Sequence, residues 1–301
     1  MRAAVTGGAG FIGSHLADAL ISEGHEVYVI DNLSSGSKAN IPEKAVFMKR
    51  DICNDLSLEL EGMDVVFHLA ADPDVRASAI EPKNSFDINV GGTFRLLESC
   101  RKADIKRIVF PSTSTVYGDA ELIPTPETYP CAPISNYGAS KLACEAYLSS
   151  YSGTYGIKAT TLRLANIFGE RSSHGVMFDF FNKLSKNPRE MEILGDGKQD
   201  KSYLHVSDCV SAIMTAWEKQ KERYDVFNVG SREKMAVSDI AKMMCRQMGL
   251  LPELRYTGTP KGWPGDVRLM LLDASKLERL GWKQETSFEE GLRRYIGWLD
   301  S

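Results

Sequence analysis

The sequence has no long apolar run, no cluster of cysteines and no excess of positive charge. No stretch reaches the roughly 18 uninterrupted apolar residues that a membrane-spanning helix needs. The formal net charge of -4 gives no electrostatic signature for binding nucleic acid. We therefore expect neither a membrane nor a nucleic acid as partner, and a small-molecule ligand is the better hypothesis.

The six cysteines lie far apart, with no C-x-x-C pair, and no histidines stand at metal-ligand spacing. We expect buried thiols in a reducing cytoplasm and no metal site. An apolar strand that begins at Ala3 and continues into a glycine turn leaves no room for a signal peptide. These absences predict a cytoplasmic protein.

Of the 301 residues, 43% are hydrophobic, which is enough to bury a substantial core. In the first half, short apolar runs alternate with longer amphipathic stretches, the pattern typical of βαβ units and a parallel sheet. The predicted strands are 2–6, 26–30, 45–49, 64–69, 107–112 and 158–164. The predicted helices between them are 11–23, 83–103 and 135–155.

After residue 165 the pattern changes, and no repeat or long linker separates the two halves. The elements predicted here are a strand at 225–229 and helices at 177–186, 207–220, 237–248, 274–280 and 287–300. The sequence thus predicts an α/β fold, a Rossmann-type doubly wound parallel sheet with a smaller α/β C-terminal substrate lobe. The expected NAD-binding domain is 1–165 plus about 204–232, and the expected lobe is about 166–203 plus 233–301.

A glycine-rich turn joins the first predicted strand to the first predicted helix. It has glycines at Gly7, Gly10 and Gly13, and it also satisfies G-x-G-x-x-G through Gly8. Glycines let the backbone approach a pyrophosphate, which the N–H groups at the helix N-terminus can bind. Asp31 ends the next strand, where a carboxylate accepts ribose hydroxyls and repels a 2′-phosphate. We therefore expect NAD rather than NADP. The alternative for the glycine motif is a turn that only connects a strand to a helix, and the alternative for Asp31 is a carboxylate at a strand end or turn with no ligand.

Tyr137 and Lys141 are four residues apart and share one face of a predicted helix. A free phenol has a pKa of about 10 and is a poor base at neutral pH. A neighbouring ammonium, aided by the positive nicotinamide ring, favours the phenolate, so we expect the pKa of Tyr137 to be brought toward neutral pH. Most such pairs are surface helix contacts, but here a hydroxyl-rich segment containing Ser112 and Thr113 ends a predicted parallel strand upstream. Side chains at that end of a parallel sheet face the ligand crevice.

The segments TGGAGFIGSHL, DNLSSG, HLAA, STSTVYG and YGASK occur in that order. In this order and spacing they resemble the extended short-chain dehydrogenase/reductase family, and within it the nucleotide-sugar 4-epimerases of the UDP-galactose 4-epimerase group. The resemblance covers essentially the whole chain, including LRLANIFG at 162–169 and PGD at 264–266.

The resemblance implies that Tyr137 is the catalytic base, Lys141 its electrostatic partner and Thr113 an assisting hydroxyl. The implied NAD-binding residues are Gly7, Gly10, Phe11, Ile12, Gly13, Asp31, Asn32, Asp51, Ile52, Leu69, Ala70, Ala71, Asn89 and Lys141. The implied substrate-binding residues are Ser112, Thr113, Asn166, Lys201, Tyr203, Asp266 and Met270. Asn89 and Asn166 have the alternative of satisfying nearby backbone groups.

The pair that follows Thr113, Ser114-Thr115, helps to distinguish between the reactions of the family. Related 4,6-dehydratases resemble one another in carrying Asp-Glu where this chain has Ser114-Thr115, and the related UDP-glucuronate decarboxylases carry Glu in place of Thr115. Elimination of water needs an acid and a base besides the tyrosine. The resemblance therefore implies epimerisation at C4 of a UDP-hexose, UDP-glucose or UDP-galactose, through a transient 4-keto intermediate. Met270 aligns with a position near the sugar C2 substituent, which suggests tolerance of N-acetyl sugars.

Other readings stay open at this point. They are a UDP-N-acetylhexosamine 4-epimerase, a net reductase or dehydratase, a 2-epimerase, and an NAD-bound regulatory or scaffold protein. Lys201 and Trp263 stand where relatives have arginines, and Arg163, Arg171, His174 and Arg268 are candidates to replace those diphosphate contacts. The helices at 88–103 and 137–155 resemble the pair through which relatives form a homodimer as a four-helix bundle.

Overall fold

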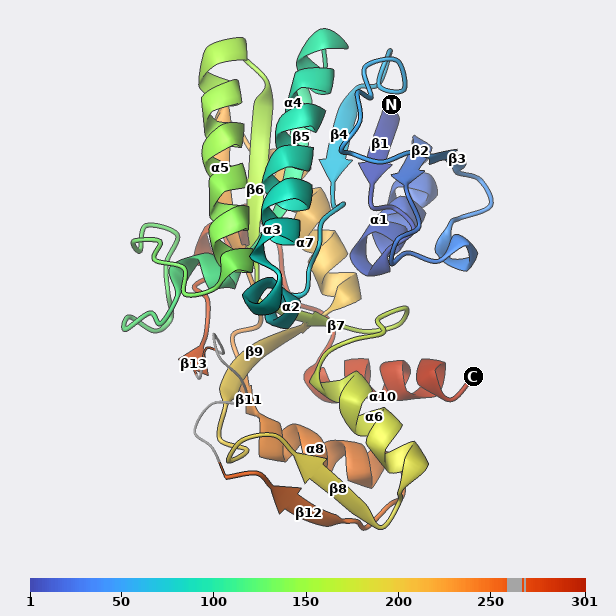
Figure 1. Ribbon diagram of the computed structural model, residues 1–301, viewed down its shortest axis with the longest axis vertical. Helices are drawn as coiled ribbons and strands as arrows, with labels where there is room; N and C mark the ends of the chain where they lie inside the picture. Colours follow the sequence, from blue (N-terminus) through green and yellow to red (C-terminus); the bar gives the residue numbers. More distant parts are fainter. Residues whose placement is uncertain (259–266, 268) are drawn as a thin grey trace.

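The computed structural model describes residues 1–258, 267 and 269–301. Its central element is a seven-stranded parallel sheet in the order β10-β6-β5-β4-β1-β2-β3 (Figure 1). The strands are β1 (Arg2–Thr6), β2 (Glu26–Asp31), β3 (Val46–Lys49), β4 (Val65–His68), β5 (Arg107–Thr113), β6 (Lys158–Leu164) and β10 (Tyr224–Val229). The strand order reverses between β1 and β4, which is the point where doubly wound sheets bind ligands. The predicted fold class is confirmed.

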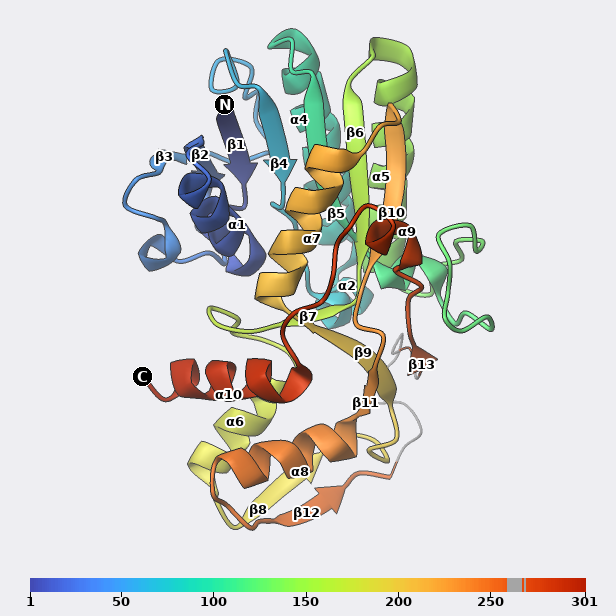
Figure 2. The same ribbon diagram turned by 180° about the vertical axis from the view of Figure 1, so that it is seen from behind.

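Helices cover both faces of this sheet. On one face lie α1 (Phe11–Ser22) and α7 (Val206–Lys219), and on the other lie α4 (Gly92–Lys102) and α5 (Asn136–Tyr155) (Figures 1 and 2). Successive side chains of a strand point to opposite faces, so Val5 packs with α1 whereas its neighbour Ala4 belongs to the core under α4 and α5. Burial on both faces explains why these strands read as continuous apolar runs.

A smaller lobe lies beside the carboxyl ends of the main strands (Figure 1). Its main sheet contains β7 (Asn166–Phe168), β9 (Asp200–His205), β11 (Lys234–Ala236) and β13 (Leu269–Met270). A separate parallel pair is formed by β8 (Glu190–Ile193) and β12 (Glu253–Tyr256). Its helices are α6 (Val176–Lys186), α8 (Val237–Gln247) and α10 (Phe288–Leu299), which enclose a core of their own. We propose that this lobe and the main sheet are the two domains.

Several elements differ from the sequence predictions. The short strands β7, β8, β11, β12 and β13 and helix α2 (Val75–Ile80) were not predicted, because so few residues carry no readable periodicity. The single helix predicted at 83–103 consists of three consecutive pieces: α3 (Pro82–Asn84), a π-helical segment η2 (Ser85–Gly91), and α4. The helix predicted at 274–280 is reduced to α9 (Ser275–Glu278).

All six cysteines are free thiols in this structure. Four are buried, but Cys53 and Cys131 are partly exposed, which corrects the expectation that all six would be buried. Within the described residues, no group of three or more His, Cys, Asp or Glu side chains is arranged to hold a metal ion. None of the helices in the described part of the chain is both long enough and apolar enough to cross a membrane.

Candidate active site

A cavity of about 1100 Å³ runs along the carboxyl ends of the parallel strands and reaches the smaller lobe. Such clefts are where open α/β sheets bind their ligands. The predicted site residues that line it are Gly7, Gly10, Phe11, Ile12, Gly13, Asp31, Asn32, Asp51, Ile52, Leu69, Ala70, Ala71, Ser112, Thr113, Tyr137, Lys141, Asn166, Lys201 and Tyr203. The fold therefore brings together residues that are almost 200 positions apart in the chain.

The glycine turn between β1 and α1 is compact enough to exclude side chains. Gly7 has a φ of +69°, and a Cβ on Gly13 would lie 2.2 Å from the Gly7 carbonyl oxygen. Among the described residues, no side chain caps the N-terminus of α1, which begins directly after Gly10. The first backbone N–H groups of α1 are thus available to an anion, so the turn fits the pyrophosphate of a dinucleotide.

Asp31 connects the glycine turn to the loop after β2. Its Oδ2 accepts a hydrogen bond from the Ala9 backbone N–H at 3.0 Å, and its Oδ1 accepts one from the Leu33 N–H at 2.7 Å. The side chain is almost buried and still lines the cavity. These bonds fix a carboxylate where the ribose of a bound dinucleotide would lie, and its charge suits NAD better than NADP.

Asp51 lies at the same end of the cavity. Its carboxylate accepts hydrogen bonds from the Cys53 backbone N–H at 2.8 Å and from Asn32 Nδ2 at 2.9 Å. The Cys53 bond is the main reason that the pKa of Asp51 lies below its usual value. These hydrogen bonds therefore hold Asp51 as an ionised carboxylate at this end of the cavity at neutral pH.

Tyr137 and Lys141 lie in the first two turns of α5 and both line the cavity. Burial raises the pKa of Tyr137 above its usual value, and the neighbouring Cys144 and Asp72 act in the same direction. Burial also lowers the pKa of Lys141 to about 8. Its Nζ lies 4.0 Å from the centre of the Phe110 ring. The raised pKa of Tyr137 comes from burial of the phenol. That the Lys141 ammonium and a nicotinamide ring together favour the phenolate stays a prediction.

Ser112 and Thr113 end β5 and line the cavity. The Ser112 hydroxyl donates a hydrogen bond to Glu145 on α5. Thr113 Oγ1 accepts one from the Thr115 backbone N–H at 3.2 Å. That acceptor role leaves the Thr113 proton available either to Thr115 Oγ1, which lies 3.1 Å away, or to a bound substrate.

Asn89 does not line the cavity, although the resemblance implied a cofactor contact. Its amide oxygen accepts a hydrogen bond from the Asp72 N–H at 2.8 Å, and its Nδ2 donates to the Asp72 carbonyl at 3.1 Å and to Ser140 Oγ at 3.0 Å. It belongs to the π-helical segment η2, and such segments are frequent near functional sites. Asn89 therefore shapes the cavity indirectly by holding the loop that carries Asp72.

The predicted substrate residues have mixed positions. Asn166, Lys201 and Tyr203 line the cavity from β7 and β9, and Asn166 Nδ2 donates to the Ser202 carbonyl at 3.1 Å. Met270 is buried in a small apolar cluster and is not among the cavity-lining residues. Asp266 lies outside the described residues, as do Trp263 and Arg268.

Of the candidates for replacing the missing arginines, Arg171 and His174 line the cavity, and Arg171 also pairs with Asp18 at 2.7 Å. For Arg163, the structure corrects the prediction that it could replace a diphosphate contact. It is buried in an ion pair with Glu145 at 2.7 Å, so its guanidinium is committed to the core rather than to a diphosphate.

Sequence reasoning missed other cavity-lining residues. Asp72 directly follows the HLAA motif, so position after a buried strand could have identified it. Tyr295 and Trp298 come from α10, and the centres of their stacked rings lie 6.2 Å apart. No sequence signal connects these two residues with the glycine turn.

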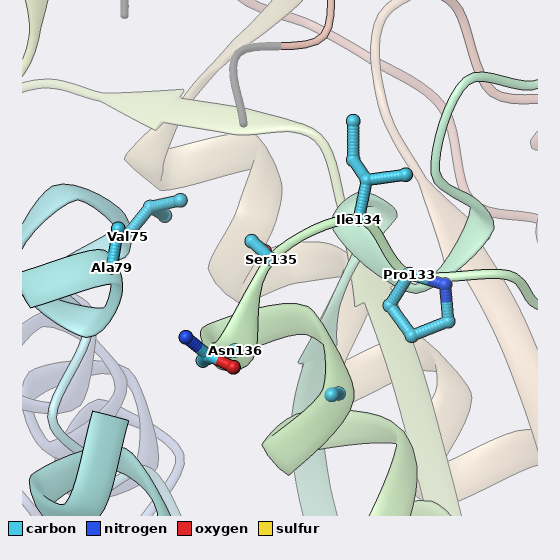
Figure 3. Close-up of a pocket in the computed structure, with 7 residues that line it drawn as sticks. Val75, Ala79, Pro133, Ile134, Ser135 and Asn136 are labelled. Carbon is cyan, nitrogen blue, oxygen red and sulfur yellow. The ribbon is translucent and has the colours of Figure 1, made fainter. Parts of the chain in front are cut away.

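A second, smaller cavity of about 380 Å³ lies between α2 and the start of α5 (Figure 3). In Figure 3, Val75 and Ala79 face Ile134 and Pro133 across it. Two hydrogen bonds fasten α2 here, because Asn136 Nδ2 donates to the Ser78 carbonyl at 2.8 Å and the Tyr137 backbone N–H donates to Ser78 Oγ at 3.3 Å. Val75 lines both cavities, so α2 forms a wall between them next to the Tyr137 turn.

Known proteins resemble this chain in sequence and in fold. The sequence profile of the NAD dependent epimerase/dehydratase family matches residues 3–230. A UDP-glucose 4-epimerase from Mycolicibacterium smegmatis is 33% identical over 98% of this chain and 97% of its own length. The crystal structure of a UDP-galactose 4-epimerase is 42% identical, with a TM-score of 0.92, over 100% of this chain and 99% of that one. The UDP-glucose 4-epimerase from Thermotoga maritima, solved with UDP-glucose, is 37% identical with a TM-score of 0.94, over 100% of this chain and 99% of that one.

Proposed function

The chain belongs to the NAD dependent epimerase/dehydratase family, and from this premise we propose that it epimerises C4 of a UDP-hexose, interconverting UDP-glucose and UDP-galactose through a transient 4-keto sugar. The observation that carries the proposal is one cavity lined by the glycine turn, Tyr137, Lys141 and the hydroxyls that end β5. In this proposal the enzyme is an isomerase that keeps NAD tightly bound.

NAD is the cofactor of this family. In the proposal, the N–H groups at the start of α1 hold its pyrophosphate, Asp31 holds the adenosine ribose, and Lys141 holds the nicotinamide ribose. When bound, NAD supplies a hydride acceptor and donor for C4 and a positively charged ring near the phenol.

The chain supplies the proton chemistry. Tyr137 takes the proton of the C4 hydroxyl and later returns it, while the Lys141 ammonium stabilises the phenolate. Thr113 donates a hydrogen bond to the same sugar oxygen. A phenol with a raised pKa loses its proton only when positive charge is close. The proposal therefore requires both the Lys141 ammonium and the nicotinamide ring for Tyr137 to act as a base.

An epimerase is favoured over a dehydratase because Ser114 and Thr115 follow Thr113. Both line the cavity and neither can serve as the carboxylic acid that elimination of water needs. The sugar is held from the smaller lobe by Asn166, Lys201 and Tyr203 in this proposal, with Asp266 and Met270 as further candidates.

The test is a proton NMR time course of the purified protein with UDP-glucose, UDP-galactose and their N-acetyl forms, without added NAD. We expect the two UDP-hexoses to interconvert with no consumption of external cofactor. Conversion that requires stoichiometric NADH, or no conversion of any of the four substrates, would contradict the proposal.

We also propose that the protein forms a homodimer through α4 and α5. Phe94 and Tyr147 are 42% and 41% exposed on this face and their rings lie 5.7 Å apart. Tyr155 and Phe86 add further exposed aromatic surface. An apolar face of this kind is typical of an interface between subunits, and a two-fold dimer would join the two helix pairs as a four-helix bundle. Free thiols suit a cytoplasmic location, which is part of the same proposal.

A further inference from the structure

Glu145 follows Lys141 by four residues and Tyr137 by eight on α5, so the three side chains share one face of the helix. It is only 3% exposed, yet it carries a carboxylate. Arg163 donates to that carboxylate from Nε at 3.1 Å and from Nη2 at 2.7 Å. Ser112 donates to it as well. Burying a charge carries a desolvation penalty that only such partners offset, so a buried carboxylate at this position points to a specific role.

The ion pair belongs to a hydrogen-bond network that crosses the main sheet. Arg163 Nη1 donates to the Tyr117 hydroxyl at 2.9 Å, and that hydroxyl donates to Asn228 Oδ1 at 2.7 Å. Arg163 also lies directly opposite Ser112 in the register of β6 and β5. The network therefore ties α5 to β5, β6 and β10, and its end at Ser112 lies in the large cavity.

The bond to Glu145 determines what Ser112 can offer to a ligand. A serine hydroxyl has one proton, and here that proton is donated to the carboxylate. Towards the cavity Ser112 can then act only as a hydrogen-bond acceptor. Its neighbour Thr113 keeps a proton to donate, so the two adjacent hydroxyls have opposite polarity.

We propose that Glu145 is a positioning residue: it fixes α5, with Tyr137 and Lys141, against the end of β5 and makes Ser112 an acceptor for a sugar hydroxyl. This inference rests on the proposed epimerase function. Glu145 does not line the cavity, so it acts through Ser112 and Lys141 and not by touching the substrate.

The charge of Glu145 acts on Lys141 as well. Around the Lys141 ammonium, the titratable groups of the described residues are Tyr137, Cys144 and Glu145 on α5 and His68 on β4, while β5 presents the Phe110 ring. Burial lowers the pKa of Lys141, and the negative Glu145 opposes that shift. Loss of the carboxylate should therefore lower the pKa of Lys141 further.

The test compares Glu145→Gln with the matched control Tyr117→Phe, which removes a hydroxyl from the same buried network without touching Ser112. For Glu145→Gln we expect kcat to fall about 100-fold, as is typical when reacting groups move by about 1 Å, with little change in KM. The alkaline limb of the pH profile should move to lower pH, because the ammonium loses its proton sooner. Tyr117→Phe should keep the wild-type kcat and pH profile.

Glu145→Gln leaves Arg163 without a carboxylate and could unfold the protein for that reason alone. The double variant Glu145→Leu with Arg163→Met removes both charges and should remain folded by circular dichroism. It should show the same loss of kcat. Wild-type kcat and pH profile in either folded variant, or an equal loss in Tyr117→Phe, would overturn the inference.

Failure of the proposed function can be told apart from failure of this inference. If the wild-type protein converts no UDP-hexose, the epimerase proposal fails, and crystal structures of the wild type and the double variant still decide the positioning role. We expect the Ser112 hydroxyl to change rotamer or the start of α5 to shift in the double variant. An unchanged Ser112 and α5 would refute the role of Glu145.

Discussion

The phenol of Tyr137 carries the proposed chemistry, yet the protein holds its pKa above the ordinary value through burial. The phenolate must therefore be created by cations at the moment of reaction. We expect Tyr137→Phe to lower kcat by about 10²- to 10⁴-fold, the usual contribution of a general base. Calorimetry should show unchanged affinity for UDP. Full turnover in this variant would favour another base, and full cofactor binding without any activity in the wild type would favour a regulatory or scaffold role.

The pKa of Lys141, lowered to about 8 by burial, gives a second prediction at the residue scale. If the ammonium stabilises the phenolate, kcat/KM should fall as the pH rises through about 8, because the charge is lost there. Lys141→Arg stays charged at every accessible pH. We expect it to be less active but to lack this alkaline limb. Identical limbs in the two proteins would show that another group causes the decline.

His68 predicts an acid sensitivity of stability. It is buried between the Thr6 hydroxyl at 2.8 Å and the Thr93 hydroxyl at 2.9 Å, and burial lowers its pKa to about 3. Between pH 6.5 and 3, only the unfolded chain binds a proton at His68. The neutral, buried His68 therefore contributes fully to stability above pH 6.5, and that contribution is lost as the pH falls below this value. Urea unfolding should show that the wild type loses about 1 kcal/mol per pH unit more than His68→Gln in this range. Parallel losses would exclude His68 as the cause.

At the scale of elements, helix α5 is fixed by close contact with the turn after β5. A Cβ on Gly138 would lie 2.8 Å from the Thr115 carbonyl oxygen, whereas a Cβ on Gly153 in the same helix would meet no atom within 4 Å. We expect Gly138→Ala to displace the Tyr137 turn and lower both kcat and the melting temperature. Gly153→Ala should instead stabilise the protein by up to about 1 kcal/mol without affecting kcat, since alanine is the better helix former. Scanning calorimetry and initial rates test both, and equal behaviour of the two variants would contradict the contact.

The piece of chain at 83–103 shows what periodicity misses. Its apolar spacing predicted one regular helix, and the structure has a π-helical segment in the middle. A π-helical segment shifts the hydrogen-bond pattern by one residue, which the spacing of apolar side chains does not reveal. The shift accompanies the position of Asn89, whose amide holds the Asp72 loop instead of facing the cavity.

At the scale of the whole molecule, the exposed aromatic face on α4 and α5 predicts the oligomeric state. We expect Tyr147→Glu to convert the proposed dimer into a monomer in light scattering after size exclusion, because it buries a charge in an apolar interface. Leu58→Glu is the control, since Leu58 is 80% exposed and belongs to neither α4 nor α5. A dimer that survives Tyr147→Glu, or a wild-type monomer, would refute the proposed interface.

Sequence patterns alone were enough to predict the main sheet, the glycine turn, the place of Asp31 after β2, and the placement of Tyr137 and Lys141 on one helix. Each of these depends on residues within one strand, one turn or one helical turn, where local spacing is enough. Tertiary structure alone decided that Arg163 pairs with Glu145, that Asn89 stays behind the cavity, and that Tyr295 reaches it. It also decided the pKa of Tyr137, because burial depends on side chains that pack from distant parts of the chain. Local pattern fixes which groups are present, and long-range packing fixes their partners and their charge.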